Sequence, residues 1–166
     1  VFLNGTKLKL INSTEDTELN YVTIKNTGGG SSALKLEFSD PILNHVSVTN
    51  NYSRGIDLYQ SNPIMDNIVS SENSHQYYDG GYSAGIKMED SNPIISNILI
   101  SNNESHRGCT GMYIEDSSPI INNMSISGNI AYNEDGYLIY YSTLCIDGNS
   151  SPIISNTLIN ENKGFN

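Results

Sequence analysis

Three segments of the chain hold most of the side chains that could bind or transform a ligand: two combine tyrosine with carboxylates, and the one between them supplies His106 and Arg107. Tyrosine beside carboxylates and a basic group suits a sugar ring, which offers apolar CH faces and hydroxyl rims. We therefore predict a ligand-binding surface whose candidate residues are His75, Tyr77, Tyr78, Asp79, Tyr82, His106, Arg107, Tyr132, Glu134, Asp135 and Tyr137. The alternative is that the tyrosines only pack their loops against the rest of the protein.

A second set of candidate ligands recurs at one place in a repeated segment, where apolar and polar residues alternate. Its acidic members are Glu89, Glu115 and Asp147. Carboxylate oxygens on adjacent strands could hold Ca²⁺, and no other cofactor is indicated. The alternative is a solvated charged face, because Lys35, Asp57 and Lys87 alternate in charge as in a stabilising cross-strand ladder.

An internal repeat positions these residues, and it contains all five prolines of the chain. Serine stands two residues before each proline, isoleucine follows each, and asparagine lies ten residues after each. Apolar residues recur two, five and seven residues after the proline, which predicts a column of inward-facing side chains. The copies are "SDPILNHVSVTNN", "SNPIMDNIVSSEN", "SNPIISNILISNN", "SSPIINNMSISGN" and "SSPIISNTLINEN".

The segment before each proline alternates apolar and polar residues with the period of a strand buried on one face. The prolines are 22, 30, 26 and 33 residues apart. The shortest unit has room for about three short strands at roughly 3.3 Å per residue, and none for a helix. The length differences fall at one corner, in residues 27–32, 52–54, 74–84, 104–110 and 130–143.

The asparagines of the repeat predict two columns in a stack of coils. One column would form an amide ladder, each side chain donating to the next: Asn51, Asn73, Asn103, Asn129 and Asn162. The other would suit the left-handed backbone of a sharp bend: Asn67, Asn97, Asn123 and Asn156, with His45 as the exception. We therefore predict an all-β, right-handed parallel β-helix (solenoid) of about six coils, as one domain over residues 1–166.

The S-x-P-I-I-x-N-x-x-I-x-x-N repeat resembles those of right-handed parallel β-helices in pectate lyases, pectinases, alginate epimerases, phage tailspikes and microbial surface adhesins, over about residues 19–162. A leucine-rich repeat shares the apolar spacing, but it returns through a helix or an irregular segment. The resemblance implies a fold and leaves activity open, because one scaffold serves many functions.

Motifs of the enzymes in that group are incomplete here. Alginate epimerases carry an Asp-Pro-His-Glu motif, of which "DPIL" at Asp40 keeps two residues. The chain has no Asp-Asp pair of the kind that polygalacturonase-like enzymes use, and it has two arginines, Arg54 and Arg107, for a lyase. We therefore assign no catalytic residue. The alternative, a polysaccharide lyase or glycoside hydrolase, would work through His106, Arg107 or Asp135.

Composition limits the partners. The formal charge is −10, with eight Lys and Arg against eighteen Asp and Glu, and no basic stripe suits nucleic acid. No apolar run approaches the roughly 20 residues of a membrane span. The chain starts at Val1, so we expect a segment of a larger or assembling protein. Cys109 and Cys145 leave their pairing open, with buried free thiols as the simplest expectation.

The function that we expect is an extracellular or cell-surface module with a structural or adhesive role, in contact with a polysaccharide or a cell-surface glycan. Regular repeats, an acidic surface rich in asparagine and the incomplete enzyme motifs favour this reading. A further alternative is a subunit of an extracellular fibre. It would self-associate through the β-helix ends, where exposed strand edges can pair with another chain.

Overall fold

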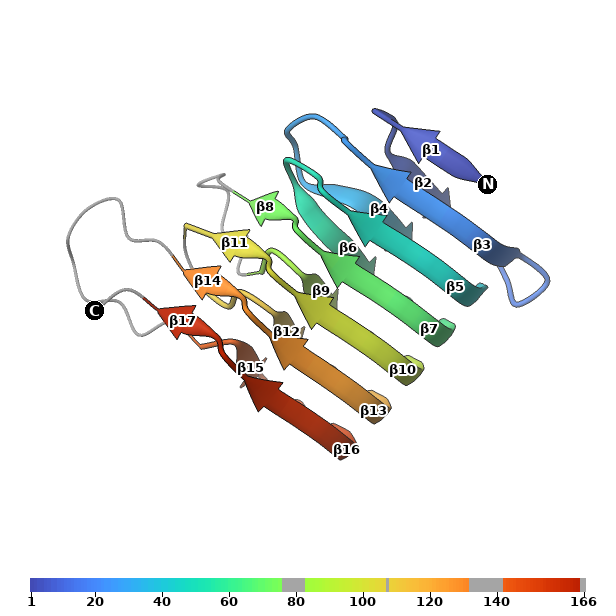
Figure 1. Cartoon of the computed structure of the whole chain (residues 1–166). Helices are drawn as coiled ribbons and strands as arrows, with labels where there is room; N and C mark the ends of the chain where they lie inside the picture. Colours follow the sequence, from blue (N-terminus) through green and yellow to red (C-terminus); the bar gives the residue numbers. More distant parts are fainter. Residues whose placement is uncertain (76–82, 107, 132–141, 165–166) are drawn as a thin grey trace.

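The computed structural model describes residues 1–75, 83–106, 108–131 and 142–164, and within these ranges the chain forms strands and turns without any helix. Neighbouring strands pair in parallel, in three sheets that the chain visits in turn (Figure 1). This architecture confirms the predicted all-β parallel β-helix. Because the described residues contain no helix, none could cross a membrane as a helical span.

The largest sheet has seven strands, in the order β1 (Phe2–Asn4), β3 (Glu18–Lys25), β5 (Ile42–Thr49), β7 (Ile64–Ser71), β10 (Ile94–Ser101), β13 (Ile120–Ser127) and β16 (Ile153–Asn160). The second has six, in the order β2 (Leu8–Ile11), β4 (Ser32–Glu37), β6 (Arg54–Tyr59), β9 (Ile86–Glu89), β12 (Met112–Glu115) and β15 (Leu144–Asp147). The third has four, in the order β8 (Ser74–His75), β11 (Glu104–Ser105), β14 (Ile130–Ala131) and β17 (Lys163–Gly164).

The number of complete coils is lower than expected. Four coils carry a strand in each sheet: β6–β8, β9–β11, β12–β14 and β15–β17. Residues 1–53 contribute strands to only two of the sheets, so the estimate of about six coils is too high for three-stranded coils. The predicted variable segments at 74–84, 104–110 and 130–143 begin with the short third-sheet strands β8, β11 and β14.

The core consists of the predicted apolar columns. In the coil of Pro93, Ile95, Ile98 and Ile100 are at most 3% exposed. Ile86 and Met88 of the preceding strand belong to the same buried cluster. Since the strands pair in register, each inner side chain lies next to its equivalents in the neighbouring coils, so the repeat itself builds the core.

The inner asparagine column forms the predicted amide ladder. Asn73 donates from Nδ2 to Oδ1 of Asn103 (3.0 Å), and Asn103 donates in the same way to Asn129 (2.9 Å). The Oδ1 of Asn103 also accepts the backbone N–H of Asn73 (3.0 Å), while its Nδ2 donates to the carbonyl of Ser70 (3.0 Å). These three asparagines are fully buried, so the ladder satisfies polar groups that would be costly to bury alone.

A second buried ladder runs through the serine that stands two residues before each proline, and the sequence analysis did not predict it. The hydroxyl of Ser91 accepts the backbone N–H of Ser61 (3.0 Å) and donates to the carbonyl of Glu89 (2.7 Å). Ser117 accepts from Ser91 in the same way (2.9 Å). A small side chain that both donates and accepts explains why every copy carries serine at this corner.

The second asparagine column lies at a bend in the middle of each long strand. Asn67, Asn97, Asn123 and Asn156 have φ between 50° and 61°, which confirms the predicted left-handed backbone. His45, the exception in the repeat, has the same conformation, with φ of 53°. The bend therefore does not require asparagine, although asparagine adopts it at lower cost than most residues.

The last coil, β15–β17, leaves part of its inner face open. Ile146 and Ile159 are 48% and 47% exposed, whereas their partners one coil earlier, Ile114 and Ile126, are fully buried. Strand β16 is the outermost strand of its sheet, so one of its edges has no pairing strand among the described residues. Apolar side chains and an unpaired strand edge make this end suitable for contact with another β-structure.

A disulfide joins Cys109 and Cys145, so the expectation of free thiols is wrong. Their Cα atoms lie 6.1 Å apart, within the usual range for a disulfide, and the bond spans 36 residues of sequence. The sequence places these residues at non-equivalent positions of the repeat, before β12 and within β15. Spacing alone therefore could not show that they meet.

We expect neither cysteine to react with a thiol-specific label in the unfolded, unreduced protein. After reduction both should react, because breaking the Cys109–Cys145 bond frees two thiols. Mass spectrometry of the labelled chain before and after reduction measures this directly. Double labelling without reduction would contradict the disulfide, and a Cys145→Ser variant that gains one label without reduction is the matched control.

Candidate functional site

The outer face of the six-stranded sheet carries the predicted acidic column. The pairing register confirms that five residues occupy equivalent positions, one coil apart: Glu37, Tyr59, Glu89, Glu115 and Asp147. Adjacent strands are roughly 4.8 Å apart, so Glu115 has an acidic neighbour on each side, Glu89 and Asp147.

Lysine side chains neutralise part of the column. The Nζ of Lys87 lies 2.6 Å from Glu89 and 3.8 Å from Glu115, and Lys9 forms an ion pair with Glu37. In the part of the chain that the structure describes, no group of three or more His, Cys, Asp or Glu side chains is arranged to hold a metal ion. Binding of Ca²⁺ by Glu89, Glu115 and Asp147 therefore stays a prediction.

Asp57 differs from the expected solvated charge. Its carboxylate accepts a hydrogen bond of 2.9 Å from Nη1 of Arg54, and both side chains are nearly buried. The Nε of Arg54 donates to the backbone carbonyl of Ser83 (2.9 Å), which ties β6 to the chain just before β9. A buried, hydrogen-bonded pair fixes geometry more than it attracts ligands, so Arg54 is structural here.

Two carboxyl groups of the acidic column have pKa values shifted in opposite directions. The hydrogen bond from Lys9, with a smaller attraction from Lys35, holds the pKa of Glu37 below its usual value. Burial raises the pKa of Glu115, and the attraction of Lys87 offsets this only in part. Glu89, Asp116 and Asp147 add to the rise through like-charge repulsion.

We therefore expect Glu115 to lose its proton at higher pH than Glu37 in a carbon-13 NMR titration of side-chain carboxyls. Lys9→Gln should raise the pKa of Glu37 and leave that of Glu115 unchanged. The folded state holds the Glu115 proton more tightly than the unfolded chain, so its contribution to stability falls as pH rises through the raised pKa. The contribution of Glu37 is instead lost as pH falls through its lowered pKa. Identical titration midpoints would contradict this account.

The loop corner is described only in part. His75 is 2% exposed and pairs in register with buried Ser105, so its ring lies beneath the surface where we expected an accessible histidine. The backbone N–H of His106 donates to the carbonyl of His75 (3.3 Å), which places the two residues on adjacent coils. The other predicted residues of this surface lie outside the described residues: Tyr77, Tyr78, Asp79, Tyr82, Arg107, Tyr132, Glu134, Asp135 and Tyr137.

A groove on the outer face of the seven-stranded sheet was not predicted. It runs along the solenoid axis from β5 to β16 and encloses about 630 Å³. One side is the column of residues with left-handed backbone: His45, Asn67, Asn97, Asn123 and Asn156. The other side is the column two residues further along each strand, which includes Leu99. The groove thus combines an amide group with an outward aliphatic side chain in β7, β10 and β16, whereas β5 and β13 offer Ser47 and Ser125 at the aliphatic position.

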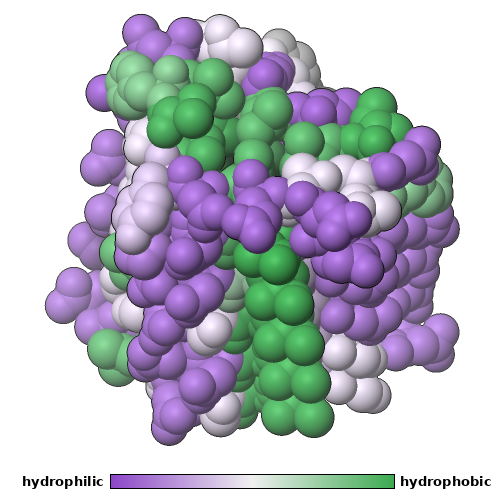
Figure 2. All heavy atoms as spheres, turned by 90° about the vertical axis from the view of Figure 1, so that its right-hand side faces the viewer, coloured by the Kyte–Doolittle hydropathy of each residue, from purple (hydrophilic) through white to green (hydrophobic). Residues whose placement is uncertain are grey.

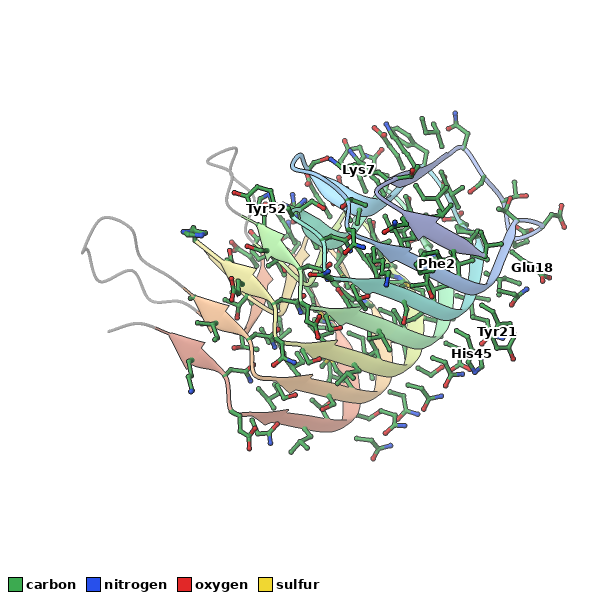
Figure 3. The ribbon with its side chains drawn as sticks, turned by 45° about the horizontal axis from the view of Figure 1, so that its top comes forward. Phe2, Lys7, Glu18, Tyr21, His45 and Tyr52 are labelled. Atoms are coloured by element: carbon green, nitrogen blue, oxygen red, sulfur yellow. A yellow bond between two sulfur atoms is a disulfide. The ribbon has the colours of Figure 1, made fainter. Side chains whose placement is uncertain are left out.

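An aromatic pair stands at the β5 end of this groove. Tyr21 and His45 occupy the left-handed column, both with φ of 53°, and their rings stack with centroids 4.6 Å apart. Tyr21 is 67% exposed, and Figure 3 shows the two side chains next to each other, outside the ribbon. A bulky residue with positive φ is an uncommon, strained choice, and such strain is often found at functional sites.

An apolar stripe also runs along the molecule where the long strands begin. The isoleucine after each proline is in register with its equivalents, and Ile64, Ile94, Ile120 and Ile153 are between 47% and 63% exposed. Figure 2 shows a hydrophobic stripe between hydrophilic columns on this side of the molecule. β-Branched side chains in register stabilise a sheet, so this stripe has a sufficient structural explanation.

The groove could not be read from the repeat because its two sides come from residues that looked structural. The sequence signal was the exception in the second asparagine column, where His45, and Tyr21 in the irregular first unit, replace asparagine. In the structure these two residues form a stacked aromatic pair that marks one end of the groove. Comparison of the chain with protein-family models, with curated proteins and with solved structures finds no match.

Proposed function

We propose that this chain is a rigid extracellular or cell-surface module with a structural and adhesive role, and that it contacts glycans. The observation that supports this most is the regular stack of coils, in which two buried side-chain ladders fix outward-facing columns of polar and aromatic residues. A preorganised repeating surface suits a repeating ligand, because little conformational freedom is lost on binding. Among parallel β-helices, the proposal favours the adhesin type.

The disulfide supports the proposed location. Disulfides persist in secreted and cell-surface proteins and are rare in reducing compartments. The bond between Cys109 and Cys145 fixes the segment before β12 to β15, which belongs to the coil whose inner face is partly open. A structural disulfide at this place fits an oxidising environment.

The test is a panel of immobilised polysaccharides and cell-surface glycans, with the bound protein measured and the supernatant analysed by mass spectrometry. The proposal predicts binding to at least one glycan without shortened or unsaturated oligosaccharides in the supernatant. A panel in which nothing binds would contradict the adhesive role. Running the panel with and without Ca²⁺ also tests the predicted ion site of Glu89, Glu115 and Asp147.

A second candidate function, a glycoside hydrolase, is favoured by one observation. Glu115, with its raised pKa, stands between Glu89 and Asp147 on adjacent strands. Hydrolases pair a protonated carboxyl group with an ionised one, and unequal pKa values identify the two roles. This function would be preferred over the adhesive role if oligosaccharide products form, disappear with Glu115→Gln and remain with Glu37→Gln.

A third candidate, assembly into a fibre, is favoured by the open inner face of the last coil, where Ile146 and Ile159 are each about half exposed. Such a face can pair with a further coil from another copy. Sedimentation analysis tests this over a range of concentrations. A monomer throughout would contradict fibre assembly, whereas growing aggregates that Ile146→Lys and Ile159→Lys abolish would support it.

A further inference from the structure

We propose that the groove on the seven-stranded sheet binds a linear, uncharged polysaccharide lying along the solenoid axis. This inference rests on the proposed glycan-contacting function and adds the site and the class of ligand. The groove crosses β5, β7, β10, β13 and β16, which are four strand spacings or roughly 19 Å. Its volume of about 630 Å³ is within the range of pockets that bind small ligands.

The side chains that line the groove favour an uncharged ligand. Its side chains carry amides, hydroxyls, thioether or aliphatic groups, and His45 is the titratable residue among them. Next to the groove, Asp66 is already engaged, because its carboxylate accepts hydrogen bonds of 2.7 Å from both Asn67 and Asn97. The formal charge of −10 also repels polyanions.

The amides of the groove are held in place and keep hydrogen-bonding capacity. Asn123 donates from Nδ2 to Oδ1 of Asn97 (2.6 Å), and Asn97 donates to Asp66 (2.7 Å). Each amide has two N–H groups, so one remains for a hydroxyl of a ligand. Across the groove, Val69, Leu99 and Leu158 offer apolar surface to the CH faces of sugar rings. This pairing of amide and aliphatic side chain recurs in β7, β10 and β16, which suits a polymer with a repeating unit.

The aromatic pair marks one end of the site. Asparagine occupies the left-handed position in the next four coils, and it adopts that backbone more easily than tyrosine or histidine. Tyr21 nevertheless keeps φ of 53° with its ring 67% exposed, and it stacks on His45, which lines the groove. An exposed aromatic ring held at a backbone cost is suited to contact the apolar face of a terminal sugar.

The experiment compares soluble neutral polysaccharides (a β-glucan, a mannan and a xylan) with polygalacturonate and alginate, by isothermal titration calorimetry. Tyr21→Asn introduces the residue that other coils carry, and Asn97→Gly removes one amide while keeping the left-handed backbone. We expect each variant to bind the neutral ligand about tenfold more weakly, as the loss of one good contact implies. The melting temperature of Tyr21→Asn should not fall, since the substitution relieves backbone strain.

Phe38→Asn is the matched control. Phe38 is an aromatic residue, 48% exposed, with φ of 52°, and it lies outside the groove. Its replacement should leave glycan affinity unchanged. If both groove variants bind neutral glycans as tightly as the unchanged protein, this inference is overturned and the proposed function still stands. Preference for the polyanions, or a change of oligomeric state in Asn97→Gly without loss of glycan affinity, would also overturn it. No binding to any glycan would overturn both proposals.

Discussion

Asn103→Ala is expected to lower the free energy of unfolding by about 4 kcal/mol, because it removes hydrogen bonds from several buried groups at once. In the folded protein the Asn103 side chain accepts from the N–H and the amide of Asn73, and it donates to the carbonyl of Ser70 and to Asn129. Alanine leaves these partners in a dry corner without replacement. Urea unfolding, followed by circular dichroism, measures the loss.

Asn122→Ala is the control for this prediction. Asn122 lies on the same solenoid but is exposed, and it accepts hydrogen bonds from Ser155 and Asn156 at the surface. Its replacement should change stability by less than about 0.5 kcal/mol, as for most surface substitutions. Equal destabilisation by the two variants would contradict the claim that the inner ladder holds the coils together.

Gly85→Ala is expected to destabilise the protein by roughly 3 kcal/mol through overpacking. A Cβ atom at this residue would overlap the backbone carbonyl of Gly111 and would lie 2.7 Å from Cγ2 of Ile100. That carbonyl cannot move away easily, because it accepts the N–H of Ile86 (2.8 Å). The inner corner beside the asparagine ladder therefore excludes even a methyl group.

Gly28→Ala provides the comparison for Gly85→Ala. A Cβ atom at residue 28 meets nothing within 4 Å. Replacement by alanine should be neutral or slightly stabilising, since it reduces the freedom of the unfolded chain. Thermal unfolding of the two variants under the same conditions distinguishes them. A Gly85→Ala protein as stable as Gly28→Ala would show that the coils are less tightly stacked than the structure indicates.

The fold could be predicted from the sequence because each coil repeats the same short pattern of apolar and polar residues. The positions of Ile95, Ile98 and Ile100 after Pro93 defined the core, and Asn103 defined the ladder, without any long-range information. The regular register of a solenoid then places every repeat on the next one. The coil count was less accurate, because residues 1–53 follow the repeat only in two of the three sheets.

Features that depend on contacts between non-equivalent positions were not predicted. Cys109 and Cys145 occupy different places in their repeats, so their disulfide follows from the three-dimensional path of the chain. The pair of Arg54 and Asp57 lies within one strand, but its burial results from the approach of Ser83. The serine ladder was visible as an invariant pattern, yet the sequence did not show where the hydroxyl of Ser91 donates.

The candidate site illustrates the same limit. The acidic column containing Glu89 and Glu115 was predicted correctly, because its members share one position of the repeat. The groove was missed, since it depends on the space between two outward columns and not on any single motif. Its aromatic end, Tyr21 and His45, consists of departures from the repeat. In a repetitive protein, departures from the repeat therefore deserve as much weight as the repeat.

The most direct test of the account is an NMR titration of the side-chain amide groups with a soluble neutral polysaccharide. We predict that the amide signals of Asn67, Asn97 and Asn123 shift on binding, because these groups line the groove. The signals of the buried ladder, Asn73 and Asn103, should stay in place. Binding without any shift of the groove amides would contradict the account, because the glycan would then occupy another surface of the solenoid.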